Sequence, residues 1–551
     1  MDLVVFENDK PYVIDEFREG RFDYLELASD VAETKFFQFL FGQGLVDQLA
    51  SHYPSPRKRH HVPLGMYVSS QLALRLHGSH SFHSYPLIIR AGGLIDALGP
   101  EVATRKVNPQ TGDMSIHCAG FNTRNLHPRA TPCDQDYLRK LAKDTDPKKL
   151  EQWYNHHVAQ LYGQLDAYDE EGIFIGDGSY LFVPNNENYE GSTRLLFDEH
   201  NHPVSKDEEK KMTPAQRQRC QWHRCYRAVF LLHCDRSGER FVIAGLRVMR
   251  ADQAEGPALW ELLDTFVGAV GRGVLKVLLV DRGFIDGPQI GRLKTEYGVD
   301  TVIPIRKNMD ILRDVRGIVK LGVPWEEYQR PRREPLTPPR PKHPTAAKRE
   351  QTRQKTLAKK HAEAQRQNPP APSDVLERTL ITKVPELTSW SDCPVPLTGV
   401  YSKDCYADGH EKDWLLVTTN PDSTAAGVRD YYAMRTDIEE LHRQVKCFWD
   451  LARFTSTAWS VIVSQTVFVA LTYSLLQLHL LQHGHQELNR RTVETSRRLL
   501  PDGDRVIIYR QQRFAFFTLL EHTELTLSLT EKARRKALAK ARRLMNDDHL
   551  A

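Results

Sequence analysis

The alternation of apolar and polar residues divides the chain into two kinds of region. Before residue 165, apolar residues recur at helical spacing, which predicts helices at Phe36–Leu49, Met66–Leu76 and Tyr85–Leu98. From Gly172 onward, short unbroken apolar runs, typical of strands buried on both faces, alternate with helical stretches. We therefore expect a helical N-terminal part followed by an α/β part.

The α/β part is predicted to form a mixed sheet with helices packed against it. The expected strands are Ile173–Asp177, Ala228–Leu232, Phe241–Val248, Val277–Asp281 and Thr301–Ile305, and the expected helices are Pro257–Val270 and Pro288–Tyr297. Pro304 lacks the N–H group that a strand ladder needs. We therefore expect the order β-β-β-α-β-α-β, with the Pro304 strand at an edge of the sheet.

The pattern changes again after residue 328. Residues 329–375 are rich in Pro, Lys, Arg and Gln and cannot bury much apolar surface, which predicts an exposed arm or a disordered insert. Further strands are expected at Arg378–Pro385, Val395–Tyr401 and Trp414–Thr419, and helices at Val428–Phe448 and Val461–Leu481. The last helix approaches the length of a membrane span, but Ser, Thr and Gln interrupt it, which favours a helix buried in a protein core.

These patterns predict five segments. They are a helical N-terminal domain that could bind DNA (1–165), the first part of an α/β core (166–312), an insertion with β-structure that carries the basic segment 329–375 (313–412), the second part of the core (413–485), and a basic helical tail (486–551).

Composition and charge narrow the class of protein. The 551 residues are 40% hydrophobic and 26% charged, as in ordinary globular proteins that do not span a membrane. Eight cysteines without a CxxC pair, and a start without the basic and apolar regions of a signal peptide, predict a cytoplasmic protein without disulfides. The net charge of +4 is unevenly distributed, because Gln329–Asn368 holds 12 Lys and Arg against three acidic residues. Such an excess is typical of polyanion-binding segments and also of solvated linkers.

The candidate chemistry lies in the helix predicted at Val428–Phe448. At roughly 100° per residue, Tyr432, Arg435, Glu439 and Lys446 share a stripe about 60° wide. An apolar stripe lies beside this polar row, whereas an ordinary solvated face would lie opposite the apolar one. The pattern therefore indicates a polar row placed next to the core.

Three carboxylates could join this row. Asp177 and Asp281 end two predicted strands, and Glu439 lies on the helix. Mg²⁺ prefers oxygen ligands and takes only a few carboxylates, which leaves places for water and phosphate. Two such ions can activate an attacking oxygen and stabilise a leaving one during phosphoryl transfer. If the sheet brings the two strand ends together, these three side chains could form such a site.

The cations of the stripe suit a nucleic acid. Arg435 and Lys446 could grip a phosphate backbone near the metal, and Tyr432 could contact phosphate or stack. With its spacing, Tyr432-x2-Arg435-x3-Glu439-x6-Lys446 matches the Y-R-E-K signature of DDE transposases of the insertion-sequence family four group. This chain therefore resembles that family.

Other segments extend the resemblance over about residues 170–450. Asp177-Gly178-Ser179 and Asp281-Arg282-Gly283-Phe284 resemble the family's two aspartate blocks, and Trp414–Asn420 resembles the strand that precedes the glutamate helix. The resemblance implies an RNase H-like core, a mixed sheet flanked by helices, with a β-containing subdomain inserted between the second aspartate and the glutamate.

The resemblance also implies an activity and its residues. The activity would be metal-dependent cleavage of DNA at transposon ends and transfer of the freed strand, with Mg²⁺ as cofactor and Mn²⁺ able to substitute. Its partners would be terminal inverted repeats and target DNA, bound by a homodimer. The implied catalytic metal ligands are Asp177, Asp281 and Glu439. The implied DNA contacts are Tyr432, Arg435, Lys446, Arg306 and Lys307.

Some positions depart from the family pattern. Many relatives carry Trp after the signature arginine and an aromatic residue three positions after the glutamate, where this chain has Thr436 and His442. Neither change removes a metal ligand, but the packing of the helix must differ locally. The basic stretch 329–375 is also unlike a compact β insertion.

Several other residues invite alternative interpretations. Glu440 falls away from the polar stripe and is expected to be a surface charge, and Asp286 is expected to cap a loop. The alternative of a zinc site arises from Cys220, His223, Cys225, His233 and Cys234, but their spacing fits no common zinc pattern well.

Three functions therefore remain open. The first is an active transposase, the second is a DNA-binding protein that kept the fold but lost or changed its catalysis, and the third is a related metal-dependent nuclease that cuts without strand transfer. The intact acidic set favours the first.

Overall fold

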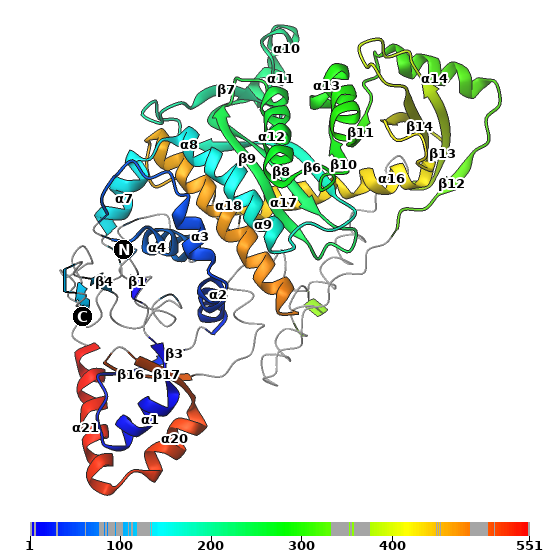
Figure 1. The fold of residues 1–551 in the computed structure, drawn as a ribbon. Coiled ribbons are helices and arrows are strands. Elements are labelled where there is room, and N and C mark those ends of the chain that lie inside the picture. The colour runs from blue at the N-terminus through cyan, green and yellow to red at the C-terminus, as the bar shows by residue number, and fades with distance from the viewer. Residues whose placement is uncertain are drawn as a thin grey trace. The chain divides into compact units, whose positions relative to one another are not determined.

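The computed structural model describes residues 3–4, 7–28, 31–60, 62–76, 135–331, 375–447, 453–484, 505–511 and 513–548, with shorter pieces between them (Figure 1). These residues divide into two compact units. One comprises Met1–Trp153, Phe448–Thr472 and Arg491–Ala551, and the other comprises Tyr154–Cys447 and Tyr473–Arg490. Nearly all of the expected helix at Tyr85–Leu98 and of 329–375 lies outside the described residues.

The second unit is built on a sheet of ten strands (Figure 1). Along the sheet, the strands lie in the order β12 (Glu326–Tyr328), β13 (Leu376–Leu387), β14 (Leu397–Tyr406), β15 (Glu411–Thr418), β11 (Asp300–Pro304), β10 (Val277–Val280), β6 (Ile173–Val183), β8 (Gln221–Cys234) and β7 (Thr193–Phe197), and β9 (Phe241–Arg250) also pairs with β8. Strand β10 runs parallel to both of its neighbours, whereas the other pairs are antiparallel. The sheet is therefore mixed, as predicted.

Strand β10 lies in the middle of this sheet because its sequence is wholly apolar. Its four residues, Val277, Leu278, Leu279 and Val280, are all buried, which fits a strand covered on both faces. The predicted order of strands and helices is present, with one additional strand, β7, and two short additional helices, α10 (Lys206–Lys211) and α11 (Pro214–Arg219), before β8.

The prediction that the Pro304 strand lies at an edge is wrong. Strand β11 lies between β10 and β15 in the interior of the sheet. Pro304 is the last residue of β11, and the pairing of β11 with β10 ends earlier, at Val302. No ladder hydrogen bond to β10 is therefore lost at the proline, which removes the reason to exclude it from an interior strand.

The strands expected in an inserted subdomain are present, but they continue the main sheet. Strand β15 pairs with β11 through Ile303 and Val417, and β14 and β13 follow outward from it. Helix α14 (Asp310–Lys320) lies between β11 and β12 along the chain. The insertion thus extends the sheet that carries the two aspartates.

Two expected helices are each divided in two. Phe36–Leu49 falls on α2 (Val31–Gly42) and α3 (Leu45–Ser51), which meet at Gly44, a glycine with a φ of 65° that ends regular helix geometry. Val428–Phe448 falls on α16 (Ala425–Met434) and α17 (Thr436–Cys447), with Arg435 at the junction.

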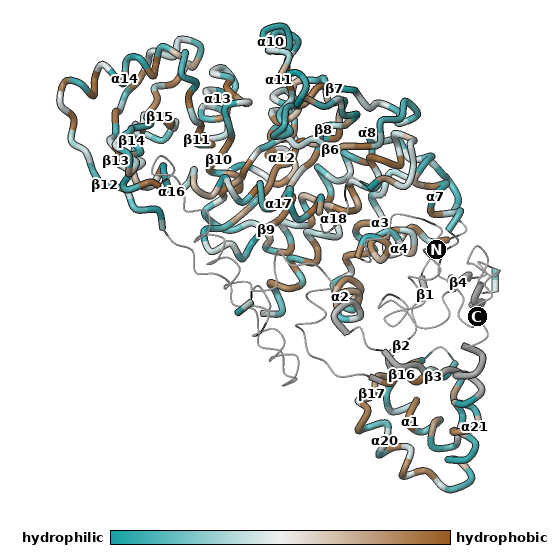
Figure 2. Tube along the Cα trace, turned by 180° about the vertical axis from the view of Figure 1, so that it is seen from behind, coloured by the Kyte–Doolittle hydropathy of each residue, from teal (hydrophilic) through white to brown (hydrophobic). Residues whose placement is uncertain are grey.

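Helix α18 (Trp459–Gln482) confirms the helix expected at Val461–Leu481. It is the one helix of the described residues that is long and apolar enough to cross a membrane. Its most apolar stretch is entirely buried inside the protein. Two of its buried polar side chains, Thr466 and Thr472, donate hydrogen bonds to carbonyls one turn earlier. In Figure 2, α18 is largely hydrophobic, whereas α10 (Lys206–Lys211) is hydrophilic.

The first unit contains more β-structure than its sequence pattern predicted. Its helices include α4 (Leu64–Leu76), which confirms Met66–Leu76, and α7 (Gln135–Asp144). A four-stranded sheet joins β3 (Tyr24–Ala28) and β2 (Glu7–Asn8) to the hairpin β16–β17 (Arg505–Arg510 and Arg513–Thr518). This hairpin precedes α20 (Leu519–Ser528) and the basic α21 (Glu531–Asp548) in the tail that we expected to be helical.

Candidate active site

The register of two parallel strands brings the two aspartates side by side. Val280 at the end of β10 pairs with Gly176 of β6. The next residue on each strand is an aspartate, Asp281 and Asp177, so both lie at the same level of the sheet. The sheet therefore brings the two strand ends together, which the predicted acidic set requires.

The alternation of side chains along β6 separates two faces of the site. A Cβ atom at Gly176 would lie 2.6 Å from Leu259 of α12 (Glu255–Val270), so that face of β6 packs against α12. Asp177 is the next residue after Gly176 and faces the opposite side of the sheet, because successive side chains of a strand point to opposite sides. Asp177 accordingly faces α17, where it contacts Arg435 and His442.

Arg435 lies among three carboxylates. Its Nη2 atom is 3.8 Å from Asp177 Oδ2 and 3.8 Å from Asp281 Oδ2, and its Nη1 atom donates a hydrogen bond of 3.0 Å to Glu439 Oε1. The Arg435 side chain is only 18% exposed, whereas that of Glu439 is 61% exposed. The three predicted ligands thus converge on one guanidinium group.

The break between α16 and α17 places Arg435 at this point. The N–H of Arg435 donates to the carbonyl of Tyr432, and the hydroxyl of Thr436 donates to the carbonyl of Ala433. Thr436 therefore satisfies a backbone acceptor at the helix end. Arg435 and Glu439 remain one helical turn apart, and their side chains pair as residues at this spacing do.

Lys446 and His442 extend the contacts of α17 along the same face of β6. Lys446 Nζ donates to the hydroxyl of Ser179, two residues beyond Asp177. His442 Nδ1 lies 3.9 Å from Asp177 Oδ2, and its ring lies 5.6 Å from that of Phe230 on β8. His442 thus packs between the sheet and the acidic set.

Burial shifts the protonation of these groups. Burial raises the pKa of Asp177 to about 7, against the opposing effect of Arg435, and Asp281 raises it further. Burial lowers the pKa of Lys446 to about 8, although Asp177 opposes this shift. Burial also lowers the pKa of His442 to about 3, and Lys446 and Arg435 lower it further. Such perturbed groups gathered at one place are typical of functional sites.

The other predicted DNA contacts lie around this centre. Tyr432 is partly buried, with its ring 5.9 Å from that of Trp414 on β15. Arg306 is exposed after β11 and donates to the carbonyl of Arg282, the residue after Asp281. Lys307 is exposed beside it. Arg306 is therefore held next to the second aspartate.

Sequence analysis missed one acidic residue beside the site. Glu255 begins α12, and its carboxylate lies against Gly178 and Gly283 on the α12 side of the sheet. Burial raises the pKa of Glu255, Arg227 lowers it, and Asp281 raises it again. The only signal in the sequence is a glycine shortly after each aspartate, Gly178 and Gly283, which does not identify the residue that occupies the space.

Other acidic residues have separate partners, as expected. Glu440 accepts two hydrogen bonds from Arg443 and one from Gln444. Asp286 accepts from the N–H of Gln289 and caps α13 (Gly287–Arg292). Both are structural roles, and neither residue lies on the polar row.

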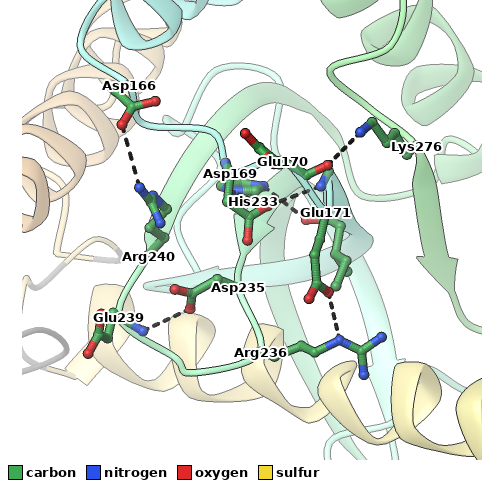
Figure 3. A network of polar contacts seen from close by, with 12 residues as sticks. Asp166, Asp169, Glu170, Glu171, His233, Asp235, Arg236, Glu239, Arg240 and Lys276 are labelled. Atoms are coloured by element: carbon green, nitrogen blue, oxygen red, sulfur yellow. Dashed lines mark hydrogen bonds and ion pairs between the residues drawn. The ribbon is translucent and has the colours of Figure 1, made fainter.

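The zinc interpretation finds no support among the described residues, in which no three His, Cys, Asp or Glu side chains form a group that could hold a metal ion. His233 is fully buried instead, with Nδ1 directed at the carbonyl of Ile173 and Nε2 accepting from the N–H of Asp169. It belongs to a network of polar contacts near the start of β6 (Figure 3). In this network Arg236 pairs with Glu171 at 2.6 Å.

The acidic set nevertheless has the donors that a hard divalent cation takes. Asp177, Asp281 and Glu439 supply carboxylate oxygens alone, and all three face one positive charge. Because the Arg435 guanidinium lies between them, the carboxylates could share an ion only after Arg435 moved aside. The chemistry of these donors suits Mg²⁺ or Mn²⁺, whereas in the arrangement described, with Arg435 among them, the three carboxylates do not form a group that could hold an ion.

Comparison with known families agrees with this geometry. A family model described as transposase DDE domain matches residues 190–475. The matched region includes Asp281, Glu439 and the whole polar row, and begins after Asp177. No curated protein matches this chain.

Proposed function

This chain belongs to the transposase DDE domain family, and from that premise we propose that it catalyses metal-dependent cleavage of DNA at transposon ends and strand transfer. One observation carries the proposal. Carboxylates from two adjacent parallel strands and from a later helix meet at a single arginine, within 3.8 Å. An acidic set that shares one cation retains excess negative charge, which a divalent ion could neutralise.

We assign the metal to Asp177, Asp281 and Glu439, on an RNase H-like arrangement of β6, β10 and α17. A bound pair of Mg²⁺ or Mn²⁺ ions would activate the attacking oxygen and stabilise the leaving one. The protein itself sets the positions of the ligands. The β6–β10 register fixes the two aspartates, and the helix break at Arg435 brings Glu439 to them.

Arg435 and Lys446 are proposed to hold the DNA end. If the three carboxylates held a divalent ion, Arg435 would be free to pair with a phosphate, which suits its planar donors. Lys446 lies further along α17 and is already directed at Ser179 beside the acids. Tyr432, Arg306 and Lys307 would extend this contact along the backbone.

The finer assignment rests on the Y-R-E-K spacing. We propose that the chain is a transposase of the insertion-sequence family four group, acting in the cytoplasm on terminal inverted repeats and target DNA. Because two ends must be joined, we expect a homodimer on the paired ends, each copy presenting the same surface.

Cleavage of the DNA ends that flank the gene tests the proposal. Wild type should nick at the inverted-repeat boundary with Mg²⁺ or Mn²⁺, and Glu439→Gln should bind the ends without nicking them. Glu440→Gln is the matched control, because Glu440 is bound by Arg443 and Gln444 and should cleave like wild type.

The other outcomes are equally informative. If the wild-type protein bound the ends but cut them with neither metal, the proposed enzymatic function would be overturned. A DNA-binding protein of the same fold would then be the better account. Free 3′ ends without joined products would indicate a nuclease.

A further inference from the structure

One carboxylate next to the acidic set has no part in the proposed mechanism. Glu255 is the first residue of α12, and its side chain is 25% exposed. It approaches the site from the face of β6 opposite Asp177, because Gly178, which it contacts, points away from Asp177 along the strand. The site therefore has acidic residues on both faces of the sheet.

Two glycines make room for this carboxylate. A Cβ atom at Gly178 would lie 2.1 Å from Glu255 Oε2, closer than any real side chain tolerates. A Cβ atom at Gly283 would lie 2.9 Å from Glu255 Oε1 and 2.8 Å from Asp281 Oδ1. The oxygens of Glu255 and Asp281 thus lie around the same point beside Gly283. Neither glycine has a positive φ, so the requirement is space and not backbone conformation.

Glu255 is also held in place from behind. Arg227 of β8 has its Nη1 atom 3.6 Å from Glu255 Oε2, and the same nitrogen donates to the carbonyl of Gln253 at 3.0 Å. The Arg227 guanidinium lies 4.6 Å from the centre of the Tyr180 ring and contacts the Tyr180 hydroxyl. An anchored carboxylate that adjoins Asp281 is suited to orienting groups around it.

We propose that Glu255 is a fourth acidic residue of the divalent-metal site, a positioning residue that orients Asp281 and the water molecules carried by Mg²⁺ or Mn²⁺. The inference rests on the proposed function. Mg²⁺ keeps several of its waters when bound to protein, and outer carboxylates that hold such ligands strengthen metal binding. The two glycines explain why this residue can act through the sheet, since any side chain at either position would displace it.

Metal titration without DNA tests the inference directly. Mn²⁺ binding, followed by the loss of the free-ion electron paramagnetic resonance signal, should weaken about tenfold in Glu255→Gln, as removal of an outer carboxylate does. Glu261→Gln is the matched control on the same helix, because Glu261 pairs with Arg247 at 3.0 Å and does not touch the site. In cleavage assays, Glu255→Gln should need more Mg²⁺ for half-maximal rate and recover the wild-type rate at saturation.

A second variant separates this role from folding. Gly178→Ala keeps the charge but displaces the Glu255 carboxylate, and it should weaken Mn²⁺ binding in the same direction. Thermal melting shows that each variant is folded. If folded Glu255→Gln bound Mn²⁺ as tightly as wild type, the role of Glu255 would be overturned and the proposed function would stand. If the wild-type protein bound no Mn²⁺, the proposed function itself would be overturned.

Discussion

Two acidic clusters lie near the strand β6, and they differ in how their charges are balanced. Just before the strand, three acids have separate partners (Figure 3): Glu171 pairs with Arg236, Asp166 with Arg240, and Asp169 accepts from the N–H of Gly172. Further along, Asp177, Asp281 and Glu439 share Arg435. The number of acids does not distinguish a structural cluster from a candidate metal site, whereas the sharing of one arginine by several acids does.

The largest expected effect is on the rate of DNA cleavage, which should fall after a substitution in the acidic set and not after one in the cluster before β6. Asp177→Asn should lower the rate of DNA cleavage by about a thousandfold, because metal stabilisation of the transition state is worth several kcal/mol and each 1.36 kcal/mol is about tenfold in rate. Asp169→Asn should cleave like wild type. Rates measured at saturating Mg²⁺ check both. Equal losses in the two variants would break the comparison.

The next effect concerns pH and the buried histidine of the paired cluster. Burial lowers the pKa of His233 to about 4, below the usual value of 6.5. Between these values the unfolded chain binds a proton at this histidine that the folded protein does not, so His233 alone lowers stability by about 3 kcal/mol as pH drops from about 6.5 to 4. Other groups, such as Asp177, titrate in the same range and in the opposite sense, so urea unfolding at pH 7 and pH 4.5 is compared between wild type and His233→Gln. His233→Gln should lose less stability than wild type over this range, and an equal change in the two proteins would contradict the assignment.

A smaller effect is expected for the shared cation. Arg435→Gln leaves three carboxylates facing one another, which should lower the free energy of unfolding by about 2 kcal/mol in the absence of metal. Adding Mg²⁺ should recover much of this loss, because the ion replaces the missing charge. Chemical denaturation with EDTA and with Mg²⁺ gives the two values. A variant as stable as wild type in EDTA would show that Arg435 does not hold the acids together.

The smallest effect is expected in the paired cluster itself. Glu171 and Arg236 are both about half exposed, and exposed pairs of this kind contribute about 0.5 kcal/mol. Glu171→Gln should therefore change stability little and leave cleavage unchanged. A loss comparable to that of Arg435→Gln would show that the two clusters do not differ in the way proposed.

Much of the candidate site could be predicted from local spacing. Asp177 and Asp281 each follow an apolar run, and the helical spacing of Arg435 and Glu439 survives the break between α16 and α17. What could not be predicted depends on pairing between distant segments. The interior place of β11 requires β15, more than a hundred residues later, and nothing in the Pro304 strand shows that it has this second neighbour.

The surroundings of Glu255 could not be predicted for the same reason. Its sequence neighbours, Gly256 and Pro257, indicate only the start of a helix. The residues that define its surroundings, Gly178 and Gly283, are far away along the chain and are recognisable as its neighbours only in the folded protein.

The pairing of β12 with β13 has a consequence for how this protein could change over generations. Tyr328 lies opposite Thr379, so the chain leaves the sheet for its most basic stretch and returns to it at neighbouring points. Lengthening such a connection costs little, about 0.6 kcal/mol for each doubling. A lineage could therefore acquire, enlarge or discard this positively charged stretch by a single in-frame insertion or deletion, while the strands on either side keep their alignment.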